Sequence, residues 1–207
     1  MSAAIPEKRN LFKELKAEYC QPKAPKLVEP SVGSYLAMDG QGAPGGDAYQ
    51  ACMEALYGMA YTIKFARKGE GADFVVCKLE GLYAIEISFE EFAALPQEQW
   101  KWRMMIRLPE GVEDAHLVSA RAALLKKGKT GDFDSVRLEE MHESQCVQML
   151  HVGAYDEEQR TLDVMLAFCA ENNLKPHQWH HEIYLSDPRR VPSEKLKTIL
   201  RLPVKGN

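Results

Sequence analysis

Apolar residues return at helical spacing in two stretches, one in each half of the chain. The longer stretch covers about residues 47–68, and Lys68-Gly69 supplies a stop signal at its end. The shorter stretch follows Asp156 and Gln159, which form a helix-capping pattern. Its apolar positions fit the steps i, i+3, i+4 and i+7: Leu162, Met165, Leu166 and Cys169. Two amphipathic helices are therefore predicted.

Stretches that are rich in β-branched or aromatic residues, or that alternate, predict strands. The clearest alternation is in WKWRMMIRL, residues 100–108, where tryptophan and aliphatic side chains share one face and basic side chains share the other. The other predicted strands cover residues 34–39, 74–87, 146–152, 180–187 and 197–204. Each half of the chain thus has the order strand, helix, strand, strand.

Three shorter helices are also predicted. Residues 7–19 carry apolar side chains on one helical face. Ser88 and Glu91 form a capping-box pattern before Pro96. Residues 110–131 have the pattern of a charged helix followed by a turn.

The repeated order of elements indicates an internal duplication, and MMIRLP at 104–109 aligns with TILRLP at 198–203. We predict an α+β domain of two βαββ units with pseudo-two-fold symmetry. Its antiparallel sheet would carry helices on one side and a ligand groove between the halves on the other. The predicted segments are a helical leader, 1–25, and the domain, 26–207, with repeats at about 32–109 and 144–204.

Composition narrows the class of protein. The 207 residues are 45% hydrophobic and 27% charged, which excludes a disordered, fibrous or disulfide-scaffold chain. The 26 Lys and Arg against 30 Asp and Glu give a net charge of −4, without the basic excess typical of nucleic-acid binding. The sequence has no apolar run of about 18 residues, no signal-peptide core and no CxxC pair among its five cysteines. We expect a cytoplasmic protein with reduced thiols, no membrane segment and no direct contact with nucleic acid.

Glu182 is the strongest candidate for a ligand-binding or catalytic residue. It lies in HHEIYLSD, on the strand face that it shares with His180, Tyr184 and Ser186. A carboxylate in mid-strand is costly to bury without a partner. Two interpretations remain open: a solvated Glu on an exposed face, or a carboxylate at the floor of an aromatic pocket. In a pocket it would attract a cationic ligand or act as a base.

Aromatic residues of other elements offer walls for such a pocket, through stacking and cation–π contacts. They are Tyr57, Tyr61 and Phe65 on the first helix, Tyr83 on the following strand, and Trp100 and Trp102 on the next. For each of them ordinary core packing is the alternative.

The repeat leaves one register open. Matching Glu80 to Glu182 would place two carboxylates symmetrically across the groove. Matching Tyr83 to Tyr184 sets Gly81 against Glu182 and turns Glu80 to the other face. We favour the second match and rank Glu80 below Glu182 as a ligand-binding residue.

The six histidines show no metal-ligand spacing, because His180 and His181 are adjacent on a strand and face opposite ways. We therefore predict no metal and no cofactor.

The segments EALYGMAYTIKF, LEGLY, WKWRMMI, HHEIYLSDPRR and LKTILRLPV resemble the GyrI-like small-molecule-binding proteins over roughly residues 8–204. The resemblance implies a duplicated βαββ fold. It relates the chain to effector-binding domains of multidrug-sensing regulators, in which a Glu on the equivalent strand contacts cationic, lipophilic ligands. That role would fall to Glu182.

The chain is also similar to a stand-alone subfamily that includes hydrolases of cyclopropanoid DNA-alkylating compounds, which hold their substrate in an aromatic cage. The cage would comprise Tyr61, Tyr83, Trp102, Trp179 and Tyr184. The main hypothesis is binding of lipophilic, cationic or planar aromatic xenobiotics. One alternative is a hydrolase with Glu182 and Tyr184 as catalytic residues. Another, by analogy with a gyrase-inhibitory relative, is inhibition of a DNA enzyme by protein contact.

Overall fold

The structure is a computed structural model that describes residues 8–83, 91, 94–177 and 179–206. These residues form an α+β protein whose strand pairs are antiparallel. The chain forms two compact units, each assembled from separate segments. Unit 1 comprises Met1–Leu15, Gly33–Cys77 and Gln97–Met141, and unit 2 comprises Lys16–Val32, Lys78–Pro96 and His142–Asn207.

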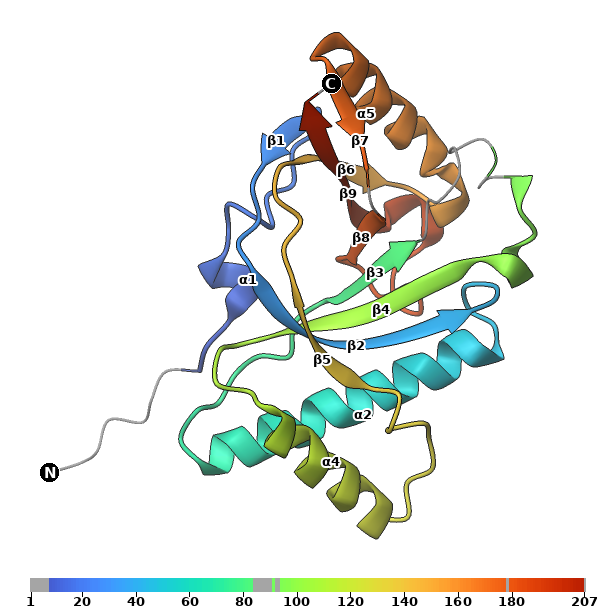
Figure 1. The fold of residues 1–207 in the computed structure, drawn as a ribbon. Helices are drawn as coiled ribbons and strands as arrows, with labels where there is room; N and C mark the ends of the chain where they lie inside the picture. Colours follow the sequence, from blue (N-terminus) through green and yellow to red (C-terminus); the bar gives the residue numbers. More distant parts are fainter. Residues whose placement is uncertain (1–7, 84–90, 92–93, 178, 207) are drawn as a thin grey trace, which may run out of the picture. The chain divides into compact units, whose positions relative to one another are not determined.

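Unit 1 is built on three strands, with β2 paired to both β4 and β5. In Figure 1 the long helix α2 runs along these strands, and α4 lies against α2. The strands are β2 (Gly33–Gln41), β4 (Lys101–Leu108) and β5 (Arg137–Met141). The helices are α1 (Leu11–Glu14), α2 (Asp47–Gly69), the 3-10 turn η1 (Gln97–Gln99) and α4 (Asp114–Lys126).

The core of unit 1 lies between α2 and its strands. The buried stripe of the helix includes Leu56, Met59 and Ile63, which have no exposed surface. Near the end of β2 and the start of β4, Gly40 stands opposite Trp102. A Cβ atom on Gly40 would lie 2.0 Å from the indole ring, so only glycine leaves room for this tryptophan. Trp102 is consequently buried, and its Nε1 donates to the carbonyl of Gly42 at 3.0 Å.

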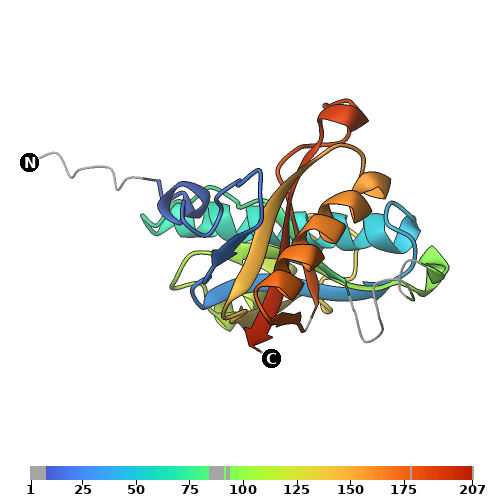
Figure 2. The ribbon, with the colours of Figure 1, turned by 90° about the horizontal axis from the view of Figure 1, so that it is seen from above.

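In the described part of unit 2, five strands pair in the order β1-β6-β9-β8-β3, and a sixth, β7, pairs with β9. Helix α5 packs against β6 and β7, and Figure 2 shows it, in orange, from above. The strands are β1 (Lys26–Val28), β3 (Leu79–Tyr83), β6 (Cys146–Val152), β7 (Leu174–Pro176), β8 (His180–Tyr184) and β9 (Lys197–Gly206). The helices are η2 (Tyr155–Glu157), α5 (Gln159–Glu171) and η3 (Ser193–Lys195).

The amphipathic pattern of α5 accounts for the core of unit 2. Leu162, Met165 and Cys169 project from the helix onto aliphatic residues of β6 and β9, and together they form one buried cluster. Burial of each large aliphatic side chain contributes on the order of 1.5–3 kcal/mol. This packing fixes the first turn of α5 against the strands, which matters for the site described below.

The structure confirms the two main predicted helices and corrects several boundaries. The predicted helix 7–19 is a helix over Leu11–Glu14, because the backbone of Leu15 leaves the helical conformation. The hydroxyl of Tyr19, farther along, donates to the buried Glu80. Within the predicted strand 74–87, Leu79–Tyr83 form β3, residues 75–78 are not part of a strand, and residues 84–87 lie outside the described residues. Helix 110–131 covers Asp114–Lys126. The helix expected at Ser88 lies mostly outside the described residues.

The order strand, helix, strand, strand is present twice, as β2-α2-β3-β4 and as β6-α5-β8-β9 with β7 added. The origin of this order in a duplication, and the repeat boundaries, stay predictions. The two compact units do not follow those boundaries, because β3 belongs to the predicted first repeat and yet pairs with β8 in unit 2. No helix in the described part of the chain is long and apolar enough to cross a membrane.

Candidate functional site

The β3–β8 strand pair of unit 2 presents two faces with different chemistry. Its register sets Gly81 opposite Glu182 and Tyr83 opposite His180. Residues that stand opposite each other in an antiparallel pair point to the same face. Tyr83, His180, Glu182 and Tyr184 therefore share one face, and Glu80 and His181 share the other. Aligning Tyr83 with Tyr184 in the two predicted repeats leads to the same expectation, that Gly81 is set against Glu182 and that Glu80 faces the other way.

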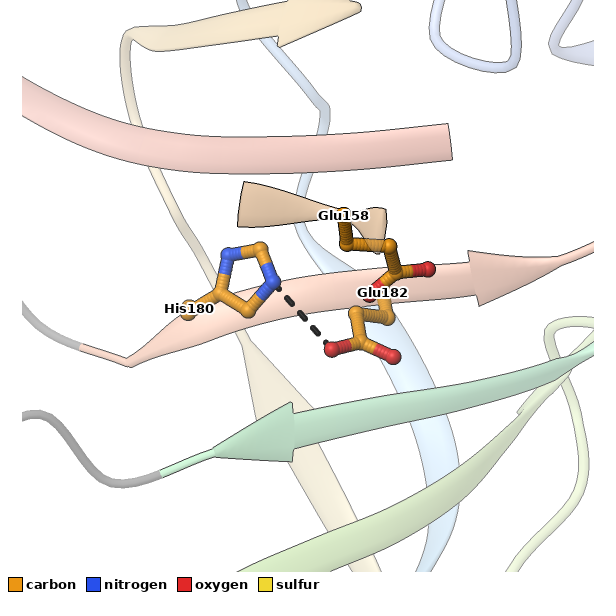
Figure 3. Close-up of side chains that lie close together, drawn as sticks. All are labelled: Glu158, His180 and Glu182. Carbon is orange, nitrogen blue, oxygen red and sulfur yellow. Dashed lines mark ion pairs between the residues drawn. The ribbon is translucent and has the colours of Figure 1, made fainter. Parts of the chain in front are cut away.

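Glu182 is held by its neighbours on the strand. Its side chain is 12% exposed, and the hydroxyl of Tyr184 donates to its Oε2 at 2.7 Å. Its Oε1 lies 3.2 Å from Nε2 of His180, and Figure 3 shows these two side chains pointing toward each other. Tyr83 and Tyr184 join their hydroxyls at 2.8 Å, and Tyr83 is the donor because Tyr184 gives its proton to Glu182. The interpretation of Glu182 as a solvated surface carboxylate is thus wrong.

A second carboxylate, Glu158, completes this face and was missed by sequence reasoning. It is the residue immediately before α5, and it is 7% exposed. The chain reaches it from β6 through Gly153, whose φ of 144° is open to glycine but strained for other residues. The capping role predicted for Asp156 is wrong, since Asp156 lies inside η2 and the helix begins after Glu158.

Donor atoms of Glu158, His180 and Glu182 all lie within 4.8 Å of one another. We call these three residues the acidic cluster, and Figure 3 shows their side chains close together. Glu158 comes from the residue before α5, and the other two come from strand β8. The Oε1 atom of Glu158 is buried and has no hydrogen-bond partner among the described residues. One imidazole and two carboxylates are groups that can hold either a cation or a proton.

The electrostatics of the acidic cluster are dominated by negative charge. Burial, and the charge of the adjacent Glu182, hold the pKa of the Glu158 carboxyl well above its usual range, and the hydroxyl of Thr198 acts in the opposite direction. Burial and the charges of Glu158, Glu182 and Asp187 raise the pKa of Tyr155 to about 12. A proton or another positive charge is therefore favoured beside these carboxylates.

Tyrosine rings border the same face within unit 2. The rings of Tyr155 and Tyr184 meet edge to face, with centroids 5.8 Å apart. Tyr83 is buried, and Trp179 is half-buried just before β8. Of the predicted cage, Tyr83 and Tyr184 are thus brought together at Glu182.

The other predicted aromatic residues belong to unit 1. Tyr57 and Tyr61 stack along α2 with centroids 6.3 Å apart, whereas Phe65 is 63% exposed. Trp102 packs over Gly40 and meets the ring of Tyr49 edge to face. A ligand-binding role for these residues stays a prediction.

The opposite face of the β3–β8 pair carries a buried ion-pair network. His181 lies 2.9 Å from Glu143 through Nδ1 and 3.1 Å from Glu80 through Nε2. Arg201 on β9 pairs with the second oxygen of Glu143 at 2.6 Å. Tyr19 donates to Glu80 at 2.7 Å. We call Glu80, Glu143, His181 and Arg201 the buried network; its two carboxylates face two cationic groups.

The buried network also determines the protonation of its members. Although burial opposes both charges, His181 and Arg201 hold the pKa of Glu143 down at about 2, and Glu143 and Glu80 raise the pKa of His181 to about 9. Glu80, ranked well below Glu182 as a ligand-binding residue, is 1% exposed and faces away from it.

Comparison with known proteins agrees with this fold. The GyrI-like small molecule binding domain matches residues 36–205. A solved structure described as a hydrolase from Listeria innocua is 35% identical, covers 96% of this chain and 100% of its own, and has a TM-score of 0.87. An uncharacterized conserved protein from the same organism is 36% identical with the same coverage and a TM-score of 0.88.

A more distant solved structure shares the fold alone. The C-terminal domain of EcmrR is 10% identical, and the match covers 88% of this chain and 98% of that domain with a TM-score of 0.57. No curated protein matches the chain. Because the family match spans most of its length, the chain belongs to the family of GyrI-like small-molecule-binding domains.

Proposed function

We propose that this protein binds organic xenobiotics that are lipophilic and cationic, or planar and aromatic, at Glu182. The observation that carries the proposal is a carboxylate of 12% exposure that is held by a tyrosine and a histidine and bordered by aromatic rings. Among the described residues, the ion pairs give Glu182 no Lys or Arg partner. A ligand cation would supply the missing charge.

Charge and shape act together in this proposal. The second carboxyl group, Glu158, lies beside Glu182, and its pKa is held well above its usual range. A cation at Glu182 would favour loss of the Glu158 proton, and the resulting charge would strengthen binding of that cation. The rings of Tyr155 and Tyr184 offer faces and edges for a flat ligand, and cation–π attraction is worth about 0.5–2 kcal/mol per contact. A lipophilic cation satisfies both features at once, whereas an anion satisfies neither.

Dye titration tests the proposal. Rhodamine 6G, a planar cation, is titrated into the wild type and into Glu182→Gln, and fluorescence anisotropy reports binding. We expect the substitution to weaken binding at least about tenfold, which corresponds to one charge-assisted contact of about 1.4 kcal/mol. Glu171→Gln, which removes an exposed carboxylate at the end of α5, is the matched control and should bind as the wild type does. Equal affinities for Glu182→Gln and wild type would refute the proposal.

The alternative function is hydrolysis of cyclopropanoid alkylating compounds, and the similarity to a Listeria innocua protein described as a hydrolase favours it. Glu182, held by Tyr184, would accept a proton from water as the water oxygen bonds to a cyclopropane carbon. The ring C–C bond would break, its electron pair would pass to the conjugated carbonyl of the substrate, and that oxygen would take a proton from solvent. Such general-base assistance is worth about 10²–10⁴-fold.

Product analysis separates the two functions. A cyclopropanoid alkylator is incubated with saturating protein, and mass spectrometry measures the ring-opened product with one added water. Acceleration over buffer that is lost in Glu182→Gln supports hydrolysis. Dye binding without acceleration supports binding alone for this substrate class.

A further inference from the structure

We propose that Glu158, His180 and Glu182 form a binding site for a divalent transition-metal ion, with Zn²⁺ as the ion that suits them best. The donors are one imidazole nitrogen and two carboxylate oxygens, and all lie within 4.8 Å of one another. Tetrahedral Zn²⁺ with bonds of about 2.0–2.2 Å sets its ligand atoms about 3.3–3.6 Å apart. The 3.2 Å between Nε2 of His180 and Oε1 of Glu182 is already close to that spacing.

Burial distinguishes this group from an ordinary acidic patch. Glu158 is 7% exposed, and its Oε1 is buried without a hydrogen-bond partner in the described part of the chain. A buried polar atom without a hydrogen-bond partner destabilises the folded state. A metal ion among the three donors would give the carboxyl group of Glu158 a partner and would also balance the two neighbouring carboxylates.

Neighbouring residues hold the donor groups in position through hydrogen bonds. In known metal sites, residues that hydrogen-bond to the metal ligands have the same effect. The hydroxyl of Tyr184 occupies Oε2 of Glu182, which leaves Oε1 directed at His180. Tyr83 in turn fixes the hydroxyl of Tyr184. Because packing of α5 and pairing of β8 fix the two segments, the donors need little rearrangement to enclose an ion.

The donor set selects among ions. Ca²⁺ and Mg²⁺ prefer six or more oxygen ligands and accept imidazole poorly, whereas a site of one imidazole and two carboxylates suits Zn²⁺. Three protein ligands leave the fourth tetrahedral position for water, as in catalytic zinc sites. Since Glu182 serves both sites, the metal and the cationic organic ligand of the proposed function should exclude each other.

Calorimetric titration of the full-length, chelator-treated protein with ZnCl₂ tests the site, and MgCl₂ serves as the comparison ion. We expect one Zn²⁺ per chain and no comparable heat from Mg²⁺. Glu158→Gln and His180→Asn should each weaken Zn²⁺ binding by more than about tenfold. Loss of a residue that only hydrogen-bonds to a metal ligand already lowers affinity by about 10–100-fold, and loss of the ligand itself should lower it at least as much. The matched controls Glu157→Gln and His142→Asn alter exposed residues of the same types and should leave it unchanged.

Absence of stoichiometric Zn²⁺ binding, or equal binding by wild type and Glu158→Gln, would overturn the metal site. Visible absorption of the Co²⁺-substituted protein gives an independent readout, since a four-coordinate site absorbs far more strongly than a six-coordinate one. This inference does not depend on the proposed function. Loss of Zn²⁺ binding in Glu158→Gln establishes the site even if rhodamine 6G fails to bind.

Discussion

The two faces of the β3–β8 strand pair hold similar residues and differ in how their charges are balanced. On one face, Glu80 and Glu143 lie against His181 and Arg201, and all four side chains are at least 95% buried. On the other face, Glu158 and Glu182 lie beside the imidazole of His180, and the described ion pairs give neither carboxyl group a Lys or Arg partner. The same strand, β8, supplies residues to both.

This difference indicates which carboxylates serve the fold and which are available to a ligand. A buried charge with a complete set of partners resists removal, because each partner would be left uncompensated. A cluster of two adjacent carboxyl groups without a Lys or Arg partner is instead stabilised when a cation binds and takes the place of the proton. The contrast therefore predicts large effects on stability for the buried network and large effects on binding for the acidic cluster.

The largest effect on stability is expected for Arg201→Met. The substitution leaves the buried Glu143 with His181 as its remaining cationic neighbour, and loss of one member of a buried pair costs about 3–5 kcal/mol. Urea denaturation measures the change in the free energy of unfolding, with the exposed Arg189→Met as the control. A change below about 1 kcal/mol would contradict the structural role of the buried network.

The second prediction concerns acid. The pKa of Glu143 is about 2 in the folded protein and about 4.3 in an unfolded chain. Its contribution is therefore complete above about pH 4.3 and is lost as the pH falls toward 2, with an upper bound of roughly 3 kcal/mol. The measurement is the free energy of unfolding of wild type and Glu143→Gln between pH 5 and 2. Parallel pH profiles would exclude Glu143 as the origin of acid sensitivity.

A smaller effect is expected for Tyr184→Phe. The variant loses the hydrogen bond to Glu182 and removes the acceptor used by Tyr83, at a cost of about 1–2 kcal/mol. It should also weaken rhodamine 6G binding less than Glu182→Gln does, because the charge remains while its orientation is lost. Stronger loss of binding in Tyr184→Phe than in Glu182→Gln would place the ligand on the tyrosine instead.

The smallest change in stability is expected for Glu158→Gln. The raised pKa of Glu158 favours its protonated form, which a neutral amide of similar size resembles. We therefore expect the free energy of unfolding to change by at most about 1 kcal/mol, as a small increase rather than a decrease. Thermal unfolding at neutral pH measures it. A loss comparable to that of Arg201→Met would show that the two faces are equivalent, and the comparison would fail.

Sequence reasoning predicted what depends on local pattern. Helical periodicity located α2 and α5, and alternation along β8 placed His180, Glu182 and Tyr184 on one face. The same alternation separated His181 from them. These predictions depend only on the spacing of residues within a single helix or strand, and that spacing can be read directly from the sequence.

The parts that sequence reasoning missed depend on contacts between distant segments. Glu158 stands in the acidic run DEE before a helix, where carboxylates are common because they complement the helix dipole. Only the docking of α5 onto β6 brings it to Glu182. The absence of a metal-ligand spacing in the sequence likewise reflects the 22 positions between Glu158 and His180, not the distance between their side chains.

The alternation of β8 also constrains how this chain is able to diverge. Substitutions can tune either face separately, since neighbouring residues serve different environments. An insertion or deletion of one residue inside β8 would instead exchange the two sets, moving His181 outward and Glu182 into the buried network. Homologous proteins should therefore vary in length at the loops around β8 and keep the length of the strand itself.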